Sequence, residues 1–206
     1  MDGWIGAIVF SHWRWSRQYV WAMTLAGVNF SKSEPRITSG VGGGKTTIAN
    51  ELACQLSAAS ILHFDEYAFE GPENLAKWAK EGADYNAWNL APLLEEVLLL
   101  KEKYDHILLD YPFAYQNDRM KDVIDVAVYI DTPLDIALVR RMLRDYQEGS
   151  ATEIKKDLSH YATYGREAYL AMEHKIKPSS DIVIDGTLSK EQITQYIIEE
   201  IEKFKW

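Results

Sequence analysis

The sequence is poor in cysteine: its 206 residues include only Cys54. One cysteine cannot form an internal disulfide, so a disulfide-stapled fold is excluded. The absence of a disulfide framework fits a reducing compartment, and we therefore expect a cytoplasmic protein. Cys54 lies on the apolar side of the helix expected after the loop, and this position predicts a small residue buried in the core.

Basic residues are also in deficit. The chain has 22 Lys and Arg against 31 Asp and Glu, for a formal net charge of −9. An acidic chain repels a phosphate backbone, and its lysines and arginines form short clusters rather than a stripe. We therefore do not expect nucleic acid as a partner.

Long apolar runs are missing from the unusual N-terminal segment. Arg14 and Arg17 divide its apolar residues into two runs, each shorter than the roughly 18 residues that a membrane span requires. It also lacks a basic start followed by an apolar run and a small-residue cleavage site. No membrane span is expected. Residues 1–34 form an N-terminal extension of unknown role: a segment packed on the domain, a leader or an interfacial anchor.

The sequence has no internal repeat, and apolar residues make up 47% of it, enough for one domain with a good core. From residue 35 to 206, short apolar runs alternate with helical periods. The runs are "SILHFD" (60–65), "DHILLD" (105–110), "VAVYID" (126–131) and "DIVID" (181–185). Helical segments are expected at 45–57, 73–81, 91–103, 133–147, 152–175 and 189–204. This order predicts an α/β fold, a doubly wound parallel five-stranded sheet flanked by helices.

The first strand is the weakest part of this pattern. The segment before residue 39 reads "SEPRITS", with Pro35 and one strong apolar residue, Ile37. Proline fits only the start or edge of a strand. Either the strand is very short, or part of "GVNF" (27–30) contributes to it, or the segment is altered.

The stretch "SGVGGGKTT" resembles a phosphate-binding loop that runs into a helix. The usual spacing is Gly, four residues, then Gly-Lys-Ser/Thr, and here the first glycine is replaced by Ser39. Glycines let the backbone turn its amides around an anion, and a helix N-terminus adds free N–H groups. The expected nucleotide-binding residues are Ser39, Gly40, Val41, Gly42, Gly43, Gly44, Lys45, Thr46 and Thr47. Lys45 would bridge phosphates, and Thr46 would reach Mg²⁺ through its hydroxyl.

Two carboxylates at predicted strand ends complete this hypothesis. Asp110 ends "HILLD" and suits a contact to Mg²⁺ together with Thr46, although a turn residue at a strand end is the alternative. Asp65 in "HFDEY" could accept a proton from the hydroxyl that attacks the γ-phosphate, or bind metal.

Further candidates lie later in the chain. Arg141 and Arg144 in "LVRRMLRD" could neutralise charge on the transferred phosphate; a solvated basic helix face is the alternative. Tyr85 and Asn86 in "DYNAWNLAPL" could stack a base and bind sugar hydroxyls, or could connect two helices. Residue spacing alone does not decide between these interpretations.

Together these segments resemble the uridine kinase and nicotinamide riboside kinase group of P-loop kinases, over about residues 36–187. "HFDEY" is similar to the segment of that group whose first aspartate is the catalytic base, here Asp65. "IDTPLDIALVRRMLRD" looks like its passage into the lid, which favours Arg141 and Arg144 as catalytic residues. The resemblance implies ATP- and Mg²⁺-dependent phosphorylation of a sugar hydroxyl.

The departures from the group are Ser39, the shortened first strand, and Asp110 where uridine kinases tend to carry Glu. The first hypothesis is a kinase that takes a nucleoside triphosphate and a small-molecule acceptor, with a homo-oligomer left open. The alternatives are a nucleotide-binding regulatory NTPase, and a non-catalytic P-loop protein with an impaired loop. The absence of an Asn-Lys-x-Asp motif counts against a GTPase.

Overall fold

The structure is a computed structural model that describes residues 19–25 and 44–203. Residues 1–18, 26–43 and 204–206 lie outside the described part, and with them residues 39–43 of the predicted phosphate loop. Within the described ranges no helix has the length and apolar character needed to cross a bilayer.

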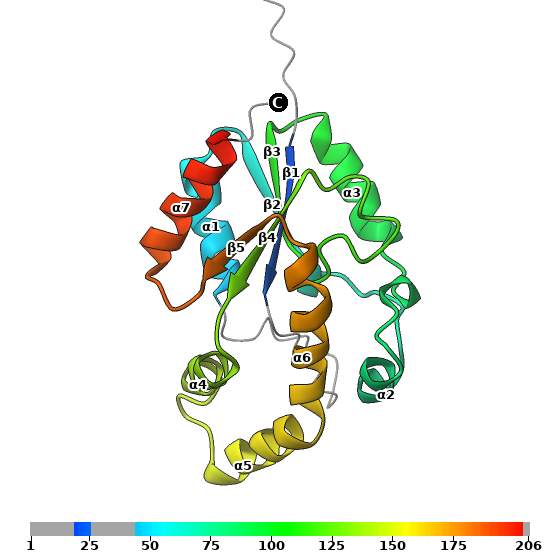
Figure 1. Cartoon of the computed structure of the whole chain (residues 1–206), viewed down its shortest axis with the longest axis vertical. Coiled ribbons are helices and arrows are strands. Elements are labelled where there is room, and N and C mark those ends of the chain that lie inside the picture. The colour runs from blue at the N-terminus through cyan, green and yellow to red at the C-terminus, as the bar shows by residue number, and fades with distance from the viewer. Residues whose placement is uncertain (1–18, 26–43, 204–206) are drawn as a thin grey trace, which may run out of the picture.

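A single parallel sheet forms the centre of the fold (Figure 1). Its strands are β1 (Tyr19–Leu25), β2 (Ala59–His63), β3 (His106–Asp110), β4 (Val126–Asp131) and β5 (Ile182–Asp185). Their order across the sheet is β2-β3-β1-β4-β5, and every neighbouring pair is parallel. The prediction of an α/β fold is therefore confirmed, and β2 to β5 occupy the four apolar runs recognised in the sequence.

The central strand lies in a segment that was predicted to be outside the domain. β1 pairs with β3 on one side and with β4 on the other. The predicted boundary at residue 35 is therefore wrong for residues 19–25, which belong to the sheet. A phosphate loop ordinarily follows its strand directly, whereas residues 26–43 separate β1 from Gly44 in this chain.

Seven α-helices connect and cover the described strands. They are α1 (Lys45–Gln55), α2 (Leu75–Lys80), α3 (Ala91–Lys101), α4 (Leu134–Asp145), α5 (Ala151–His160), α6 (Arg166–Lys175) and α7 (Lys190–Lys203). Short helical turns are η1 (Phe64–Glu66), η2 (Tyr85–Ala87) and η4 (Lys177–Ser179), and a π-helical turn, η3 (Tyr161–Gly165), joins α5 to α6. The helix predicted over 152–175 is thus one helical run with a wide turn inside it. Ser150 and Glu153 start that run with a capping box.

The strands divide their side chains between two apolar layers, as expected of a sheet covered on both faces. Leu108 and Val128 face α1 and α7, where they pack with residues such as Ile48. Leu109 and Tyr129 face the opposite layer, which includes residues of α3 and α6. In Figure 1 the sheet accordingly lies between α1 and α7 on one side and α3 on the other.

Cys54 is exposed, so the prediction that it is buried in the core is wrong. The buried positions of α1 are Lys45, Ile48, Ala49 and Leu52. Cys54 comes two residues after Leu52, about 200° around the helix at 3.6 residues per turn, and therefore faces away from the sheet.

The functional edge of the sheet follows from the strand order. The chain leaves β1 toward β2, whereas it leaves β3 in the opposite direction, toward β4. Neighbouring strands whose connections diverge create a crevice at their carboxyl ends, where α/β proteins bind ligands. In Figure 1, α2, α4 and α5 lie beyond this edge.

A chain that lacks residues 1–34 is expected to lose cooperative unfolding, because this removes the strand that joins β3 to β4. The measurement is urea unfolding followed by circular dichroism. A chain that lacks only residues 2–10 keeps every described strand and is the control. Cooperative unfolding of the 35–206 chain would contradict the central position of β1 and favour a first strand near residue 37.

Candidate phosphate-binding and phosphoryl-transfer site

The first turn of α1 has the backbone geometry of an anion site. Gly44 has a φ of 93°, in the left-handed region that glycine adopts without strain, and the helix begins at Lys45. No side chain caps the helix start. The first N–H groups of α1 therefore remain available for an anion, which the positive end of the helix dipole also favours.

Three side chains meet beside this helix start. The hydroxyl of Thr46 donates a 2.6 Å hydrogen bond to Oδ2 of Asp110, the last residue of β3. The ammonium of Lys45 lies 3.5 Å from Oδ1 of the same carboxylate. The side chains of Lys45 and Asp110 are each only 8% exposed. The structure thus brings together two predicted phosphate-loop residues and the predicted strand-end carboxylate.

The charge of Asp110 depends on these neighbours. Burial alone would raise the pKa of Asp110, because it removes the carboxylate from water. The positive charge of Lys45 and the hydrogen bonds from Thr46 and His63 outweigh burial, so that the pKa lies below its ordinary value. Asp110 is therefore ionised at neutral pH, the form that attracts a divalent cation.

His63 is a member of this cluster that the sequence analysis did not single out. It is the last residue of β2 and stands opposite Asp110 in the β2–β3 register. Its Nδ1 lies 3.3 Å from Oδ2 of Asp110. A polar residue at the carboxyl end of a buried strand, two positions before Asp65, was the signal that could have identified it.

Asp65 lies in the helical turn η1, directly after β2 and at the same edge of the sheet as Asp110. Its side chain is half-buried, whereas that of the neighbouring Glu66 is exposed. The role of Asp65 as the general base stays a prediction.

The two predicted lid arginines lie in different environments. Arg141 is 4% exposed, and its Nη2 donates a 2.7 Å hydrogen bond to Asp157 of α5. It also lies 6.0 Å from the ring centroid of Tyr161. Arg144 is exposed and pairs with the adjacent Asp145. Arg141 therefore holds α4 against α5 in this structure. The predicted contact of Arg141 with phosphate stays a prediction.

Arg140 and Arg144 line a cavity of about 400 Å³ next to the start of α1. The cavity runs between α1, α4 and the loop from β5 to α7, with Thr47, Ile48, Gly186 and Leu188 on its other walls. Nη1 of Arg140 donates a 2.9 Å hydrogen bond to the carbonyl oxygen of Gly186. Arg140 is thus a cavity residue that the predicted site did not include.

Gly186 fixes the path of the loop that forms this wall. A Cβ atom at this position would lie 1.9 Å from Oγ1 of Thr132, closer than any non-bonded contact allows. The loop can therefore approach the end of β4 only because residue 186 has no side chain.

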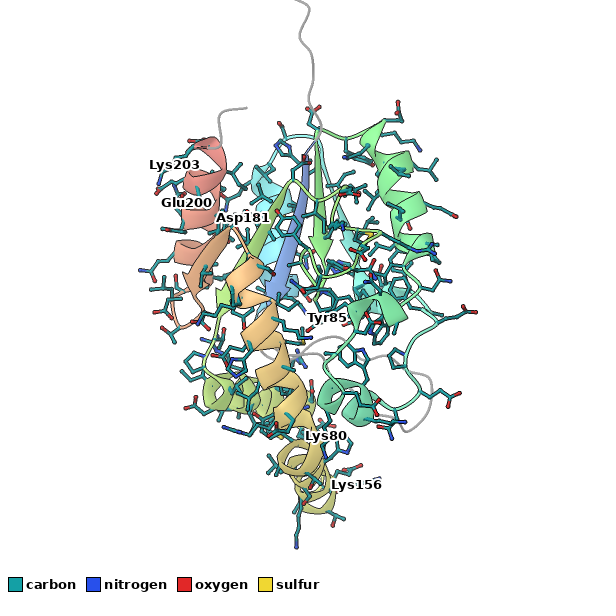
Figure 2. All side chains as sticks on the ribbon, turned by 45° about the vertical axis from the view of Figure 1, so that its right-hand side comes forward. Lys80, Tyr85, Lys156, Asp181, Glu200 and Lys203 are labelled. Carbon is teal, nitrogen blue, oxygen red and sulfur yellow. The ribbon has the colours of Figure 1, made fainter. Side chains whose placement is uncertain are left out.

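Tyr85 and Asn86, the predicted acceptor-binding residues, are engaged in packing. Tyr85 is 3% exposed, and its ring packs edge-on against Trp78 with the centroids 5.3 Å apart. Figure 2 shows Tyr85 among the crowded side chains below the sheet. The amide of Asn86 donates to Asp118 and accepts from the backbone N–H of that residue. These contacts support the alternative that the segment connects two helices, and give no support to substrate contacts.

The exchange of Asp157 for Asn is expected to lower the free energy of unfolding by about 2 kcal/mol, because a neutral amide replaces the carboxylate that pairs with the buried guanidinium of Arg141. Urea unfolding measures the change. Asp145→Asn is the matched control: it weakens the exposed pair with Arg144 and should cost less than about 0.5 kcal/mol. Equal effects of the two substitutions would contradict a structural role for the Arg141–Asp157 pair.

No family model matches the chain. Among curated proteins it is similar to the uridine kinase of Halalkalibacterium halodurans, 24% identical over 177 residues that cover 72% of this chain and 83% of that protein. The uridine kinase of Staphylococcus haemolyticus is 26% identical over 178 residues, with 72% and 84% covered.

Among solved structures, shikimate kinase from Acinetobacter baumannii in complex with shikimate aligns over 92% of this chain and 95% of that one, with a TM-score of 0.52 and 14% identity. At this identity the likeness supports the fold alone, which is an α/β kinase fold. The similarity to curated uridine kinases confirms the resemblance that the sequence motifs predicted.

Proposed function

We propose that this chain is an ATP- and Mg²⁺-dependent kinase that transfers the γ-phosphate to a hydroxyl group of a nucleoside or a similar small metabolite. One observation carries the proposal: Lys45, Thr46 and Asp110 meet at the start of α1, beside the carboxyl end of β3. Phosphoryl transfer needs mainly positioning and positive charge around the phosphates, and this cluster provides both.

The phosphate groups are bound by the first turn of α1. The N–H groups of this turn have no side-chain cap, the ammonium of Lys45 would add positive charge, and residues 39–43 would supply further amides from the predicted loop. Lys45 is buried next to a carboxylate, which keeps its side chain ordered in the absence of nucleotide. Its charge is therefore in position before the phosphates arrive, so less reorganisation is needed in the transition state.

The donor set fits Mg²⁺ bound together with phosphates. Oδ1 of Asp110 is buried and accepts no hydrogen bond from the described residues. The hydroxyl of Thr46 donates its hydrogen atom to Oδ2 of Asp110, so its oxygen lone pairs remain available to a metal. Among the described residues no group of three or more His, Cys, Asp or Glu forms a metal cage. Mg²⁺ is commonly held by one or two protein ligands plus substrate phosphates, so Thr46 and Asp110 would hold it here. When bound, it supplies positive charge beside the phosphate oxygens.

The cavity of about 400 Å³ is the proposed position of the nucleoside part of ATP. It opens next to Gly44 and Thr47, so a phosphate chain bound at the start of α1 reaches it directly. Its wall combines the apolar side chains of Ile48 and Leu188 with the guanidinium groups of Arg140 and Arg144. Arginine planes stack on aromatic rings, and this suits them to hold a base.

Asp65 is the proposed general base. It lies at the end of β2, the strand next to the one that carries Asp110, and a half-buried carboxylate there can accept the proton of the attacking hydroxyl. The acceptor class comes from the relatives, which are named uridine kinases, and a nucleoside is therefore the first acceptor to examine.

The non-catalytic alternative is favoured by one feature of the chain. The loop pattern begins at Ser39, so residues 26–38 intervene between β1 and the loop, whereas such a loop ordinarily follows its strand directly. A regulatory NTPase is the other alternative. Measurements of ATP binding and of acceptor turnover distinguish the kinase, the regulatory NTPase and the non-catalytic protein.

Lys45→Ala is expected to abolish the binding of Mg²⁺–ATP, because it removes the ammonium beside the start of α1, where the phosphates are proposed to bind. Isothermal titration calorimetry measures it, with micromolar affinity expected for the native chain. Lys203→Ala is the matched control: Lys203 forms an exposed pair with Glu200 on α7, away from the start of α1 (Figure 2). If the native chain does not bind at millimolar ATP, the kinase proposal fails.

Asp65→Asn is expected to lower kcat by roughly 10² to 10⁴ while the affinity for Mg²⁺–ATP stays unchanged, because the amide cannot take up a proton. Turnover is measured with a panel of nucleosides as acceptors. Glu66→Gln makes the same chemical change at the neighbouring exposed residue and should leave kcat unaltered. ATP hydrolysis by the native chain without turnover of any acceptor would favour the regulatory NTPase.

A further inference from the structure

His63 occupies a position that neither the phosphate loop nor the proposed general base explains. It ends β2, and the parallel register places it opposite Asp110 at the end of β3. Side chains at paired positions of neighbouring parallel strands lie on the same face of the sheet. Nδ1 of His63 is 3.3 Å from Oδ2 of Asp110, and the histidine side chain is 23% exposed.

The direction of this hydrogen bond follows from the chemistry of the partner. An ionised carboxylate has no proton to give and is only an acceptor. The hydrogen atom must therefore be on Nδ1 of His63, which donates to Oδ2 of Asp110.

The two oxygens of Asp110 are used in different ways. Oδ2 accepts from Thr46 at 2.6 Å and from His63 at 3.3 Å. Oδ1 accepts no hydrogen bond from the described residues and lies 3.5 Å from Nζ of Lys45. The terminal torsion of an aspartate is broad and roughly two-fold, so a single hydrogen bond leaves the carboxylate plane free to turn. Two donors from different elements, α1 and β2, fix the plane.

We propose that His63 is a positioning residue for Asp110: its Nδ1–H holds Oδ2 of the carboxylate in the orientation that also receives Thr46 and keeps Oδ1 free for the metal of a bound Mg²⁺–nucleotide. The inference rests on the proposed function and deepens it, because it assigns a residue outside the loop to the magnesium dependence of nucleotide binding. Groups that orient a metal ligand through hydrogen bonds affect metal affinity without touching the metal.

Three variants test the role of the Nδ1 donor. His63→Leu removes it and keeps a side chain of similar bulk. His63→Asn restores a donor at the same number of bonds from the backbone, since its amide nitrogen is attached to Cγ as Nδ1 is. His106→Leu is the matched control, because His106 lies at the opposite end of β3 and contacts the carbonyl oxygen of Ser57.

The measurement is the affinity for ATP by calorimetry, once with excess Mg²⁺ and once with EDTA. The ratio of the two affinities is the magnesium dependence. His63→Leu is expected to reduce this ratio roughly tenfold, the lower end of what the loss of such an orienting group costs in metal affinity. The affinity in EDTA should not change, His63→Asn should recover most of the ratio, and His106→Leu should match the native chain.

The outcomes separate this inference from the proposed function. If the native chain does not bind Mg²⁺–ATP, the proposed function fails and the role of His63 fails with it. If the native chain binds and His63→Leu retains the native ratio, or if the ratio falls equally in His63→Leu and His63→Asn, the inference alone is overturned. Thermal unfolding checks that each variant is folded; if His63→Leu is not, His63→Gln, whose amide is one methylene further from the backbone, replaces it with the same expectation.

Discussion

The ionised carboxylate of Asp110, buried at the end of β3, is the constraint on which the rest of the site depends. A buried charge is tolerated only when it is paired and hydrogen-bonded, and here Lys45, Thr46 and His63 provide this. These partners come from the start of α1 and the end of β2, so α1 must begin and β2 must end at fixed positions relative to β3. The register of β2 on β3 and the left-handed Gly44 before α1 meet this requirement. The electrostatic cluster and the geometry of the sheet edge thus stabilise each other.

The loop from β5 to α7 forms one wall of the cavity, and its position depends on a close approach between backbone and side chain. Gly186 lies against Thr132, and its carbonyl oxygen receives Arg140, so the loop from β5 to α7 is tied to both β4 and α4. The adjacent Arg141 points elsewhere and pairs with Asp157. Neighbouring residues on a helix point about 100° apart, which lets α4 supply one arginine to the cavity and another to the contact with α5.

Much of the fold could be predicted from the sequence because buried parallel strands appear as short apolar runs and helices appear as 3.6-residue periods. The runs that end at Asp110 and Asp131 became β3 and β4. β1 was missed because Tyr19–Leu25 lies far from the loop, in a tryptophan-rich segment. The proximity of Lys45, Thr46 and Asp110 could be predicted, because the first two follow the loop spacing and the third ends a neighbouring apolar run. His63 and the Arg141–Asp157 pair could not, because they depend on strand register and on the packing of α5.

The proposed site has two parts that come from different segments of the chain. The ammonium, the hydroxyl and the carboxylate of Lys45, Thr46 and Asp110 are held by α1 and β3, and these elements are bound to the rest of the sheet by β2, α7 and a continuous apolar layer. These contacts join residues of the described part of the chain, and residues 39–43 lie outside that part. The charges can therefore be correctly arranged even if Ser39 weakens the loop. Failure to bind nucleotide would then implicate the loop amides, whereas failure to respond to Mg²⁺ would implicate the cluster around Asp110.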